Sequence, residues 1–231
     1  MIVERVEHPQ WTSNAYLLAD GDGGSGVLVD SNGEQGLLEQ VEARGISITH
    51  VLVTHHHPDH IVGVDTLADR FGVPIEQTIE AGGTIRSGDL VIEAIAIPGH
   101  CRDQLAFAVG GTDVLTADCL FKGTVGGTGG GGPTGYEDHR RSIMERLMGL
   151  PPETRVHPGH TLGTTIGEEW ESNPFIRIWR GLDPEGTELC RVRGEEATLV
   201  LWAPDYDGTN KAWVRYADGR DAIVGGSSVT R

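Results

Sequence analysis

Thr54-His55-His56-His57-Pro58-Asp59-His60 is the stretch around which the chain is organised. It follows Val51-Leu52-Val53, a short apolar run that is typical of a buried strand. Imidazole and carboxylate groups are the side chains that bind Zn, Fe, Ni or Cu in proteins. Four histidines and one aspartate at a strand end therefore indicate a metal site, with a chance polar cluster as the alternative.

Three later strand ends carry the same kinds of side chain. The apolar run 95–97 leads to Pro98-Gly99-His100, the run 114–117 ends at Asp118, and Val156 precedes His157-Pro158-Gly159-His160. Loops at strand ends are where a rigid scaffold presents functional groups. The four motifs together predict one metal centre built from strand ends.

This order of motifs, HxHxDH, PGH, a strand-ending aspartate and a second PGH, resembles the metallo-β-lactamase superfamily. The chain is most similar to its glyoxalase II (hydroxyacylglutathione hydrolase) branch over roughly residues 14–175, and Thr164–Glu169 followed by Asn173-Pro174-Phe175 adds to the likeness. The resemblance implies an α+β fold, an αββα sandwich, for a hydrolase domain over residues 1–180. It places the metals at one edge, between the two sheets.

The resemblance also implies two divalent metal ions, with zinc as the first expectation and iron or manganese as alternatives. Carried over by position, the first metal is held by His55, His57 and His100, and the second by Asp59, His60 and His160. Asp118 bridges both ions, and Asp59 also orients the hydroxide that the metals share. His56 is expected to point away from the cluster, and His139 and His157 have no role in the family.

Hydrolysis of an acyl-thioester to an acid and a thiol is the activity that the resemblance implies. Glyoxalase II proteins hold glutathione through a basic helical appendage and a loop with lysine and tyrosine after the bridging aspartate. Here that loop is rich in glycine, with Lys122 before it and Tyr136 after it as the candidate substrate-loop residues. The expected partner is thus a small thioester or ester, whose thiol is glutathione or another low-molecular-weight thiol.

Two other activities share this frame. One is a mononuclear iron enzyme that resembles persulfide dioxygenases, which bind metal through two histidines and the aspartate. The other is a lactonase with the same metal site and a different pocket. A serine hydrolase is not indicated, because the sequence has no GxSxG motif.

Composition excludes several other functions. The net charge of −16 argues against nucleic acid and, more weakly, against anionic membranes. No apolar run approaches the ~20 residues that span a bilayer, and the charged amino terminus is not a secretory signal, so we expect no membrane partner and a cytoplasmic location. Cys101, Cys119 and Cys190 form no CxxC pair. The first two are expected to be small buried thiols beside the site, with a ligand or redox role as the alternative.

Hydrophobic patterns predict alternating strands and helices in the first half. Strands are expected at 14–19, 27–30 and 48–53, and helices at 34–44 and 61–71, with Gly45 and Gly72 as the helix stops. Asp30 ends the second strand. It is either a partner of a metal-bound histidine, which usually donates its second N–H to a carboxylate or carbonyl, or an ordinary turn residue.

The second half is predicted to be mostly β. Strands are expected at 90–97, 105–109, 114–117 and 155–157, with one helix over 137–148. The segment 123–135 has eight glycines in thirteen residues and is expected to be a loop that gates the site or merely connects elements. Residues 181–231 are expected to form a small β appendage with strands at 198–202, 212–216 and 221–224. At about fifty residues it is marginally stable on its own, so we expect it to dock on the main domain. Its aromatic residues are expected to form its core, with a platform for a ligand as the alternative.

Overall fold

The computed structural model describes residues 1–32, 35–76, 82–128 and 135–231. Two compact units divide the chain. The first unit comprises residues 1–96, 105–117 and 159–161, and the second comprises residues 97–104, 118–158 and 162–231. Residue 180, where the domain boundary is predicted, lies inside the second unit. The boundary stays a prediction.

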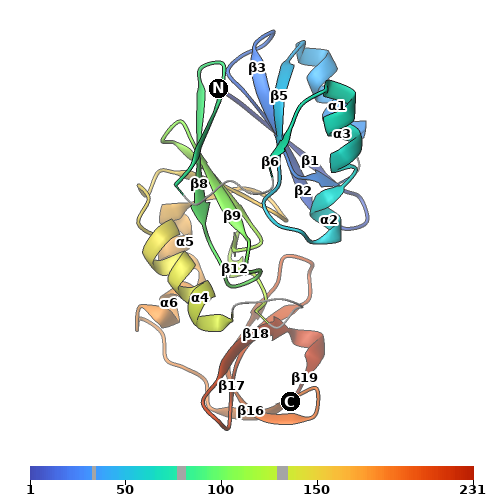
Figure 1. Ribbon diagram of the computed structural model, residues 1–231. Helices are drawn as coiled ribbons and strands as arrows, with labels where there is room; N and C mark the ends of the chain where they lie inside the picture. Colours follow the sequence, from blue (N-terminus) through green and yellow to red (C-terminus); the bar gives the residue numbers. More distant parts are fainter. Residues whose placement is uncertain (33–34, 77–81, 129–134) are drawn as a thin grey trace. The chain divides into compact units, whose positions relative to one another are not determined.

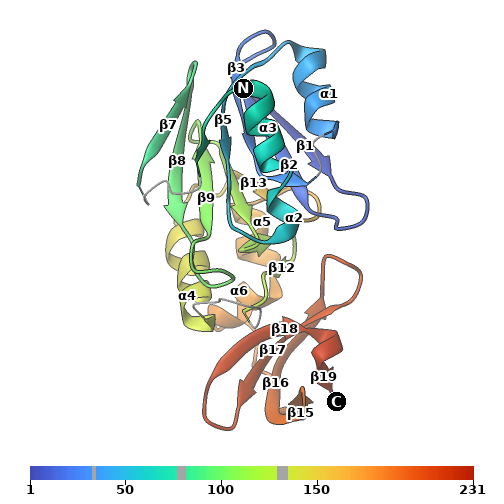
Figure 2. The same cartoon turned by 45° about the vertical axis from the view of Figure 1, so that its right-hand side comes forward.

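In its described residues, the first unit is built from two sheets and three helices. Its elements are β1 (Ile2–Glu7), β2 (Asn14–Ala19), β3 (Ser25–Val29), β4 (Ser31–Asn32), α1 (Gln35–Arg44), β5 (Ser47–Leu52), α2 (Pro58–Ile61), α3 (Val64–Phe71), β6 (Ile75–Glu76), β7 (Thr84–Ser87), β8 (Leu90–Ala96), β9 (Leu105–Val109) and β10 (Asp113–Ala117). The first sheet has the strand order β1-β2-β3-β5-β6, and its parallel pairs β3–β5 and β5–β6 are joined by helices. The second is an antiparallel meander of β7 to β10, in which β7, β8 and β9 run side by side (Figure 2).

Both faces of the first sheet are buried, which explains the uninterrupted apolar runs of β2 and β3. Helices α1 and α3 cover one face (Figure 1), where Leu37 and Leu67 join a core with Leu17 and Val51. The other face packs on the meander through residues such as Leu18 and Phe107. A helical layer and two sheets are therefore stacked within this unit, as the predicted sandwich requires.

The helix predicted over 61–71 is wrong at its start. A short helix, α2, ends at Ile61, and α3 begins only at Val64. Gly63 separates them with φ of 83°. This left-handed conformation is unfavourable for any residue that has a Cβ atom, whereas glycine adopts it readily. The predicted stop at Gly72 is confirmed, since this residue caps α3 with φ of 64°.

The described part of the second unit carries short strands, three helices and a C-terminal sheet. Its elements are β11 (Leu120–Phe121), β12 (Thr124–Val125), α4 (Tyr136–Arg141), a π-helical turn (Ser142–Leu147), β13 (Arg155–Pro158), β14 (Thr164–Thr165), α5 (Ile166–Ser172), α6 (Pro174–Trp179), β15 (Glu188–Val192), β16 (Glu195–Pro204), β17 (Asn210–Tyr216), β18 (Asp221–Gly225), a 3₁₀ turn (Gly226–Ser228) and β19 (Val229–Thr230). The predicted helix 137–148 is thus an α-helix that continues as a π-helical turn. The start of the glycine-rich segment is not irregular, because β12 lies within it and pairs with β11 just before it. Its residues 129–134, on which the gating prediction falls, lie outside the described residues.

The C-terminal sheet has the order β18-β17-β16-β15-β19 and is antiparallel throughout (Figure 2). The three predicted strands are present as β16, β17 and β18. β15 and β19 were not predicted. Trp213 of β17 lies 5.2 Å from Tyr136 of α4 and 6.3 Å from Trp179 of α6, measured between ring centroids. The sheet is therefore attached to α4 and α6 through an aromatic cluster.

Candidate metal centre

The histidine-rich stretch forms the connection between β5 and α2. Pro58 is the first residue of α2, a position that suits proline because its missing N–H needs no partner there. His55 is buried, whereas His56 is exposed. The loop thus separates the two neighbouring imidazoles, with His56 on the solvent side.

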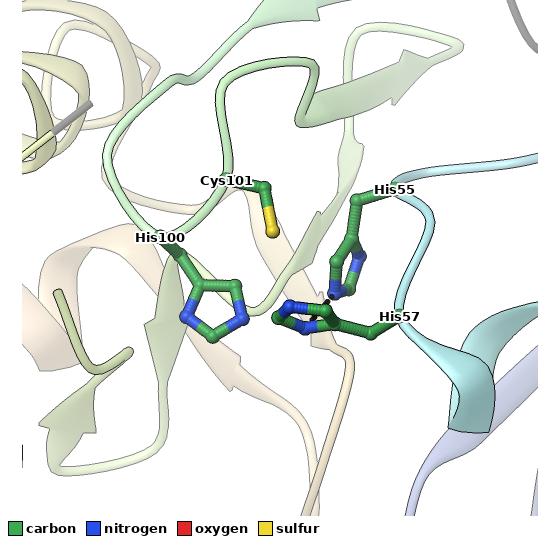
Figure 3. A group of neighbouring side chains, drawn as sticks. All are labelled: His55, His57, His100 and Cys101. Carbon is green, nitrogen blue, oxygen red and sulfur yellow. Dashed lines mark hydrogen bonds between the residues drawn. The ribbon is translucent and has the colours of Figure 1, made fainter. Parts of the chain in front are cut away.

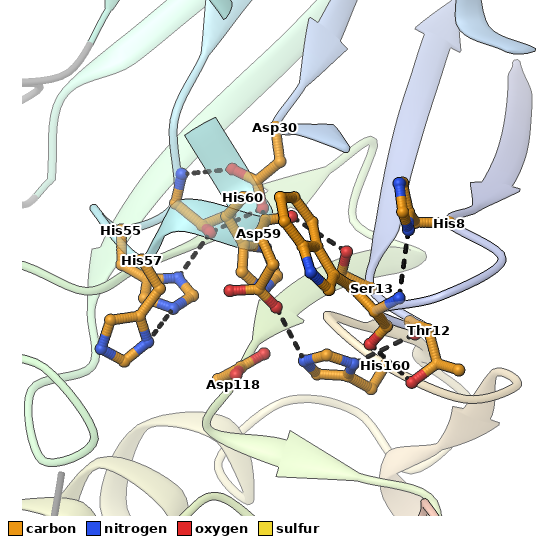
Figure 4. A network of polar contacts seen from close by, with 12 residues as sticks. His8, Thr12, Ser13, Asp30, His55, His57, Asp59, His60, Asp118 and His160 are labelled. Carbon is orange, nitrogen blue, oxygen red and sulfur yellow. Dashed lines mark hydrogen bonds and ion pairs between the residues drawn. The ribbon is translucent and has the colours of Figure 1, made fainter. Parts of the chain in front are cut away.

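The carboxylate of Asp30 organises this loop (Figure 4). It accepts hydrogen bonds from the backbone N–H and the hydroxyl of Thr54, both at 2.7 Å, and from Nδ1 of His60 at 2.9 Å. The Thr54 hydroxyl donates its only proton to Asp30, so it accepts the hydrogen bond from Nδ1 of His55 at 3.0 Å. Through these contacts, one carboxylate directs Nε2 of both His55 and His60 away from the strand. Asp30 holds φ of 59°, which an aspartate tolerates better than most residues.

His60, His160 and Asp59 converge in the first unit. Oδ2 of Asp59 lies 3.6 Å from Nε2 of His60 and 3.5 Å from Nε2 of His160. Nδ1 of His160 donates to the carbonyl of Thr12 at 3.0 Å, which fixes the proton on Nδ1 because a carbonyl can only accept (Figure 4). Ser13 donates to the Asp59 carbonyl at 2.9 Å. The β1–β2 loop therefore holds the side chain of His160 and the backbone of Asp59 in place.

His55 and His57 face each other through ring nitrogens. Nε2 of His55 and Nδ1 of His57 are 3.1 Å apart (Figure 3). Since Nδ1 of His55 already donates to Thr54, the shared proton belongs to His57. A dication that replaced this proton would be held between the two nitrogens.

His100 and Asp118 lie close together in the second unit. Nε2 of His100 is 3.6 Å from Oδ2 of Asp118, and its Nδ1 donates to the carbonyl of Gly127 at 2.8 Å. Cys101 follows His100 on the same loop (Figure 3) and is 6% exposed. Burial raises the pKa of its thiol to about 12, and burial likewise raises the pKa of the Cys119 thiol. Both thiols are therefore neutral at pH 7, in keeping with the prediction of small buried cysteines.

The donor atoms within each unit suit a metal ion. Around a tetrahedral zinc ion with bonds of about 2.0–2.1 Å, neighbouring ligand atoms lie roughly 3.3–3.4 Å apart. The separations of 3.1, 3.5, 3.6 and 3.6 Å are close to this value. Four of the imidazoles, those of His55, His60, His100 and His160, also have Nδ1 held by an oxygen atom, as metal-binding histidines usually do. The residues fit a divalent cation.

The two candidate substrate-loop residues differ in environment. Lys122 is exposed. Tyr136 is 7% exposed, and its hydroxyl accepts a hydrogen bond from Nε1 of Trp179 at 2.8 Å. This tyrosine belongs to the aromatic cluster, an arrangement that does not favour a substrate contact.

His139 and His157 also differ. His157 is half-buried, whereas His139 is fully buried and neither of its ring nitrogens has a hydrogen-bond partner among the described residues. Burial lowers the pKa of His139 from its ordinary 6.5 to about 3. His139 is therefore a neutral core residue at pH 7.

Sequence reasoning missed the support of the loop after Asp118. The carboxylate of Glu169, 1% exposed, accepts from the backbone N–H of Gly123 at 2.9 Å and from Asn173 at 2.8 Å. Asn173 also donates to the Thr124 carbonyl at 3.1 Å and caps α6. The sequence shows Glu169 within the motif Thr164–Phe175 but not that it is buried, so the glutamate in this motif was the available signal.

Comparison with known proteins assigns the chain to a family. Residues 8–77 match the model of the metallo-beta-lactamase superfamily. A hydroxyacylglutathione hydrolase of Ruegeria pomeroyi is 30% identical over an alignment that covers 97% of this chain and 92% of the relative.

Solved structures agree with this result. ETHE1 from Myxococcus xanthus superposes with a TM-score of 0.69 at 29% identity, over 79% of this chain and 92% of that one. TTHA1623, solved in a di-iron-bound form, gives a TM-score of 0.65 at 30% identity, over 75% of this chain and all of that one. The predicted metallo-β-lactamase fold is confirmed. The chain belongs to the metallo-β-lactamase superfamily and is similar to its glyoxalase II enzymes.

Proposed function

We propose that this protein is a two-metal hydrolase of small acyl-thioesters. His55, His57 and His100 would hold the first divalent cation. Asp59, His60 and His160 would hold the second, and Asp118 would bridge the two. This assignment rests on the proximity of donor atoms within each unit and on the similarity to hydroxyacylglutathione hydrolases.

The convergence of Asp59, His60 and His160 is the observation that carries the proposal. These side chains place three donor atoms within 4.8 Å of one another, and both histidines have Nδ1 committed elsewhere. A core that needed only packing would gain nothing from a carboxylate facing two imidazoles. Burying such groups costs free energy unless they are paired or bind a metal.

Divalent cations held by these residues would lower the pKa of a water molecule toward about 7 and would polarise the substrate carbonyl. The chain's own residues would set the geometry of that reaction. Asp59 is the best placed of them to orient the attacking oxygen, because its side chain remains 26% exposed while His60 and His160 are buried. Asp30 and the Thr12 carbonyl keep the histidines in the tautomer that leaves a lone pair on Nε2.

The substrate class follows from the relatives and from what this chain lacks. An acylated low-molecular-weight thiol, such as S-lactoylglutathione, is the expected substrate. The C-terminal segment is a β-sheet in place of the basic helical appendage by which glyoxalase II binds glutathione. We therefore expect modest rates of hydrolysis with thioesters of glutathione, or a preference for thioesters of another thiol.

Zinc is the proposed metal, and iron is the main competitor because a similar protein was solved with two irons. Elemental analysis of protein purified without a histidine tag decides this point. About two metal ions per chain, together with turnover of thioesters in a panel that includes lactones and β-lactams, would support the proposal. One iron per chain, together with oxygen consumption in the presence of a persulfide, would instead identify the protein as a dioxygenase. Turnover of lactones alone would identify it as a lactonase.

A further inference from the structure

The segment Gly123–Thr128, which follows β11, is held at both ends. At its start, Glu169 and Asn173 bind the backbone of Gly123 and Thr124. At its end, the N–H of Thr128 donates to the carbonyl of Ile223 at 2.8 Å, and the N–H of Ile223 donates to Oγ1 of Thr128 at 2.8 Å. Thr128 is 5% exposed. We call these six residues the strap.

Ile223 belongs to β18, one of the two edge strands of the C-terminal sheet as described. Both of its backbone groups bond to Thr128, so they point away from the partner strand β17. An edge strand leaves such groups without ladder partners, and a buried one must find them elsewhere. Thr128 supplies both, with its hydroxyl acting as the acceptor that a neighbouring strand would offer.

The middle of the strap contacts the proposed metal ligands. The carbonyl of Gly127 accepts the hydrogen bond from Nδ1 of His100 at 2.8 Å. Gly126 passes so close to Asp118 that an added Cβ would lie 1.8 Å from the Asp118 carbonyl oxygen and 3.4 Å from Nδ1 of His100. Only glycine fits there. Gly127 thus lies between Gly126, which packs against Asp118, and Thr128, which is hydrogen-bonded to β18.

We propose that Thr128 is a positioning residue through which the C-terminal sheet holds His100. By pairing with Ile223, Thr128 fixes the Gly127 carbonyl, and that carbonyl keeps the proton of His100 on Nδ1 and the lone pair on Nε2. This role rests on the proposed function, in which Nε2 of His100 binds the first metal. Through Thr128, the C-terminal sheet would contribute to the metal site as well as to packing.

The test uses three variants of the full-length protein. Thr128→Val keeps the shape but removes the oxygen that accepts from Ile223, and Thr128→Ser retains that oxygen. Thr124→Val is the matched control on the same strap, because the Thr124 hydroxyl is buried without a hydrogen-bond partner among the described residues. Should Thr128→Val not fold, as judged by circular dichroism, Thr128→Ala removes the same oxygen.

Two measurements separate positioning from general stability. Zinc titration against a chelator should show one of two sites weakened by roughly 10-fold or more in Thr128→Val, the range found for partners of metal ligands. The other site should be unchanged, and Thr128→Ser and Thr124→Val should match the wild type. Long-range ¹H–¹⁵N spectra of the metal-free protein should show His100 protonated on Nδ1 in the wild type and as a tautomer mixture in Thr128→Val.

A folded Thr128→Val protein with wild-type affinity at both sites and an unchanged His100 tautomer would overturn the inference. Equal weakening of both sites, or the same loss in Thr124→Val, would also contradict it. A wild-type protein that binds no metal refutes the proposed function instead, and the tautomer measurement still tests the contact between Thr128, Gly127 and His100.

Discussion

The carboxylate of Asp30 lies 2.9 Å from Nδ1 of His60, at the point where β3 ends and where the backbone of Asp30 adopts φ of 59°. The same carboxylate binds the N–H and hydroxyl of Thr54, and Thr54 in turn receives the proton of His55. One buried acid therefore sets the tautomers of two proposed ligands, one for each metal.

Asp30→Asn should weaken metal binding by roughly 10- to 100-fold without unfolding the protein. Asparagine tolerates the left-handed backbone, but an amide N–H₂ in place of Oδ2 would face the N–H of His60 and favour the wrong tautomer. Metal retained after dialysis against a chelator measures the effect. Asp20→Asn is the control, because Asp20 also accepts backbone N–H groups, from Ser25 and Asp89, but contacts no histidine among the interactions described. Equal metal loss in both variants would contradict the role of Asp30.

Asp118→Ala should lose both metals and all activity, whereas His160→Ala should lose mainly the second metal. A bridging carboxylate neutralises charge on both ions, while His160 would serve only one. Metal content per chain, with circular dichroism to exclude unfolding, gives the answer. A folded Asp118→Ala protein that keeps two metals and normal turnover would end the two-metal mechanism.

Glu169→Gln should lower the free energy of unfolding by about 1–3 kcal/mol, because a buried group at the start of the strap would lose its acceptor. The carboxylate accepts from Gly123, Asn173 and Thr164, and an amide can replace only part of these bonds. Thermal unfolding of the metal-free protein measures the change. Glu171→Gln, an exposed residue on α5 whose carboxylate lies 3.8 Å from Nη1 of Arg180, should cost less than about 0.5 kcal/mol. Comparable losses in the two variants would show that the buried contacts do not matter.

Acid should destabilise the folded protein through His139. Its pKa falls from 6.5 to about 3 on burial, so between these values the unfolded chain binds a proton that the folded chain does not. Stability is then lost as the pH falls, with a contribution of up to ~1.4 kcal/mol per pH unit. Denaturation of metal-free protein at several pH values between 6.5 and 4 should show a smaller loss for His139→Leu than for the wild type. Parallel pH profiles of the two proteins would refute this account.

The sequence alone determined the family, the fold class and the strand-end placement of the proposed ligands. These features are local, because an apolar run followed by a histidine or aspartate specifies both a buried strand and the polar residue at its end. The helix stops at Gly45 and Gly72 were also readable, since each has a positive φ that few other residues adopt.

Other features depended on tertiary contacts. The helix break at Gly63 was missed because the apolar spacing continues across it. β15 was missed because Leu189 is 82% exposed, so its pattern does not mark a buried strand. β19 is only two residues long and exists through its pairing with β15.

Only the tertiary structure decided which atoms orient the site. Asp30 reaches His60 across thirty residues of chain, and Thr128 meets Ile223 across ninety-five. Hydrogen bonds between such distant groups leave no periodic pattern in the sequence, because each needs one polar atom at one position. The residue types that can bind a metal are therefore visible in the sequence. The sequence left Asp30 as either a histidine partner or a turn residue and gave no signal for Thr128, and only the folded chain shows which contacts these residues make.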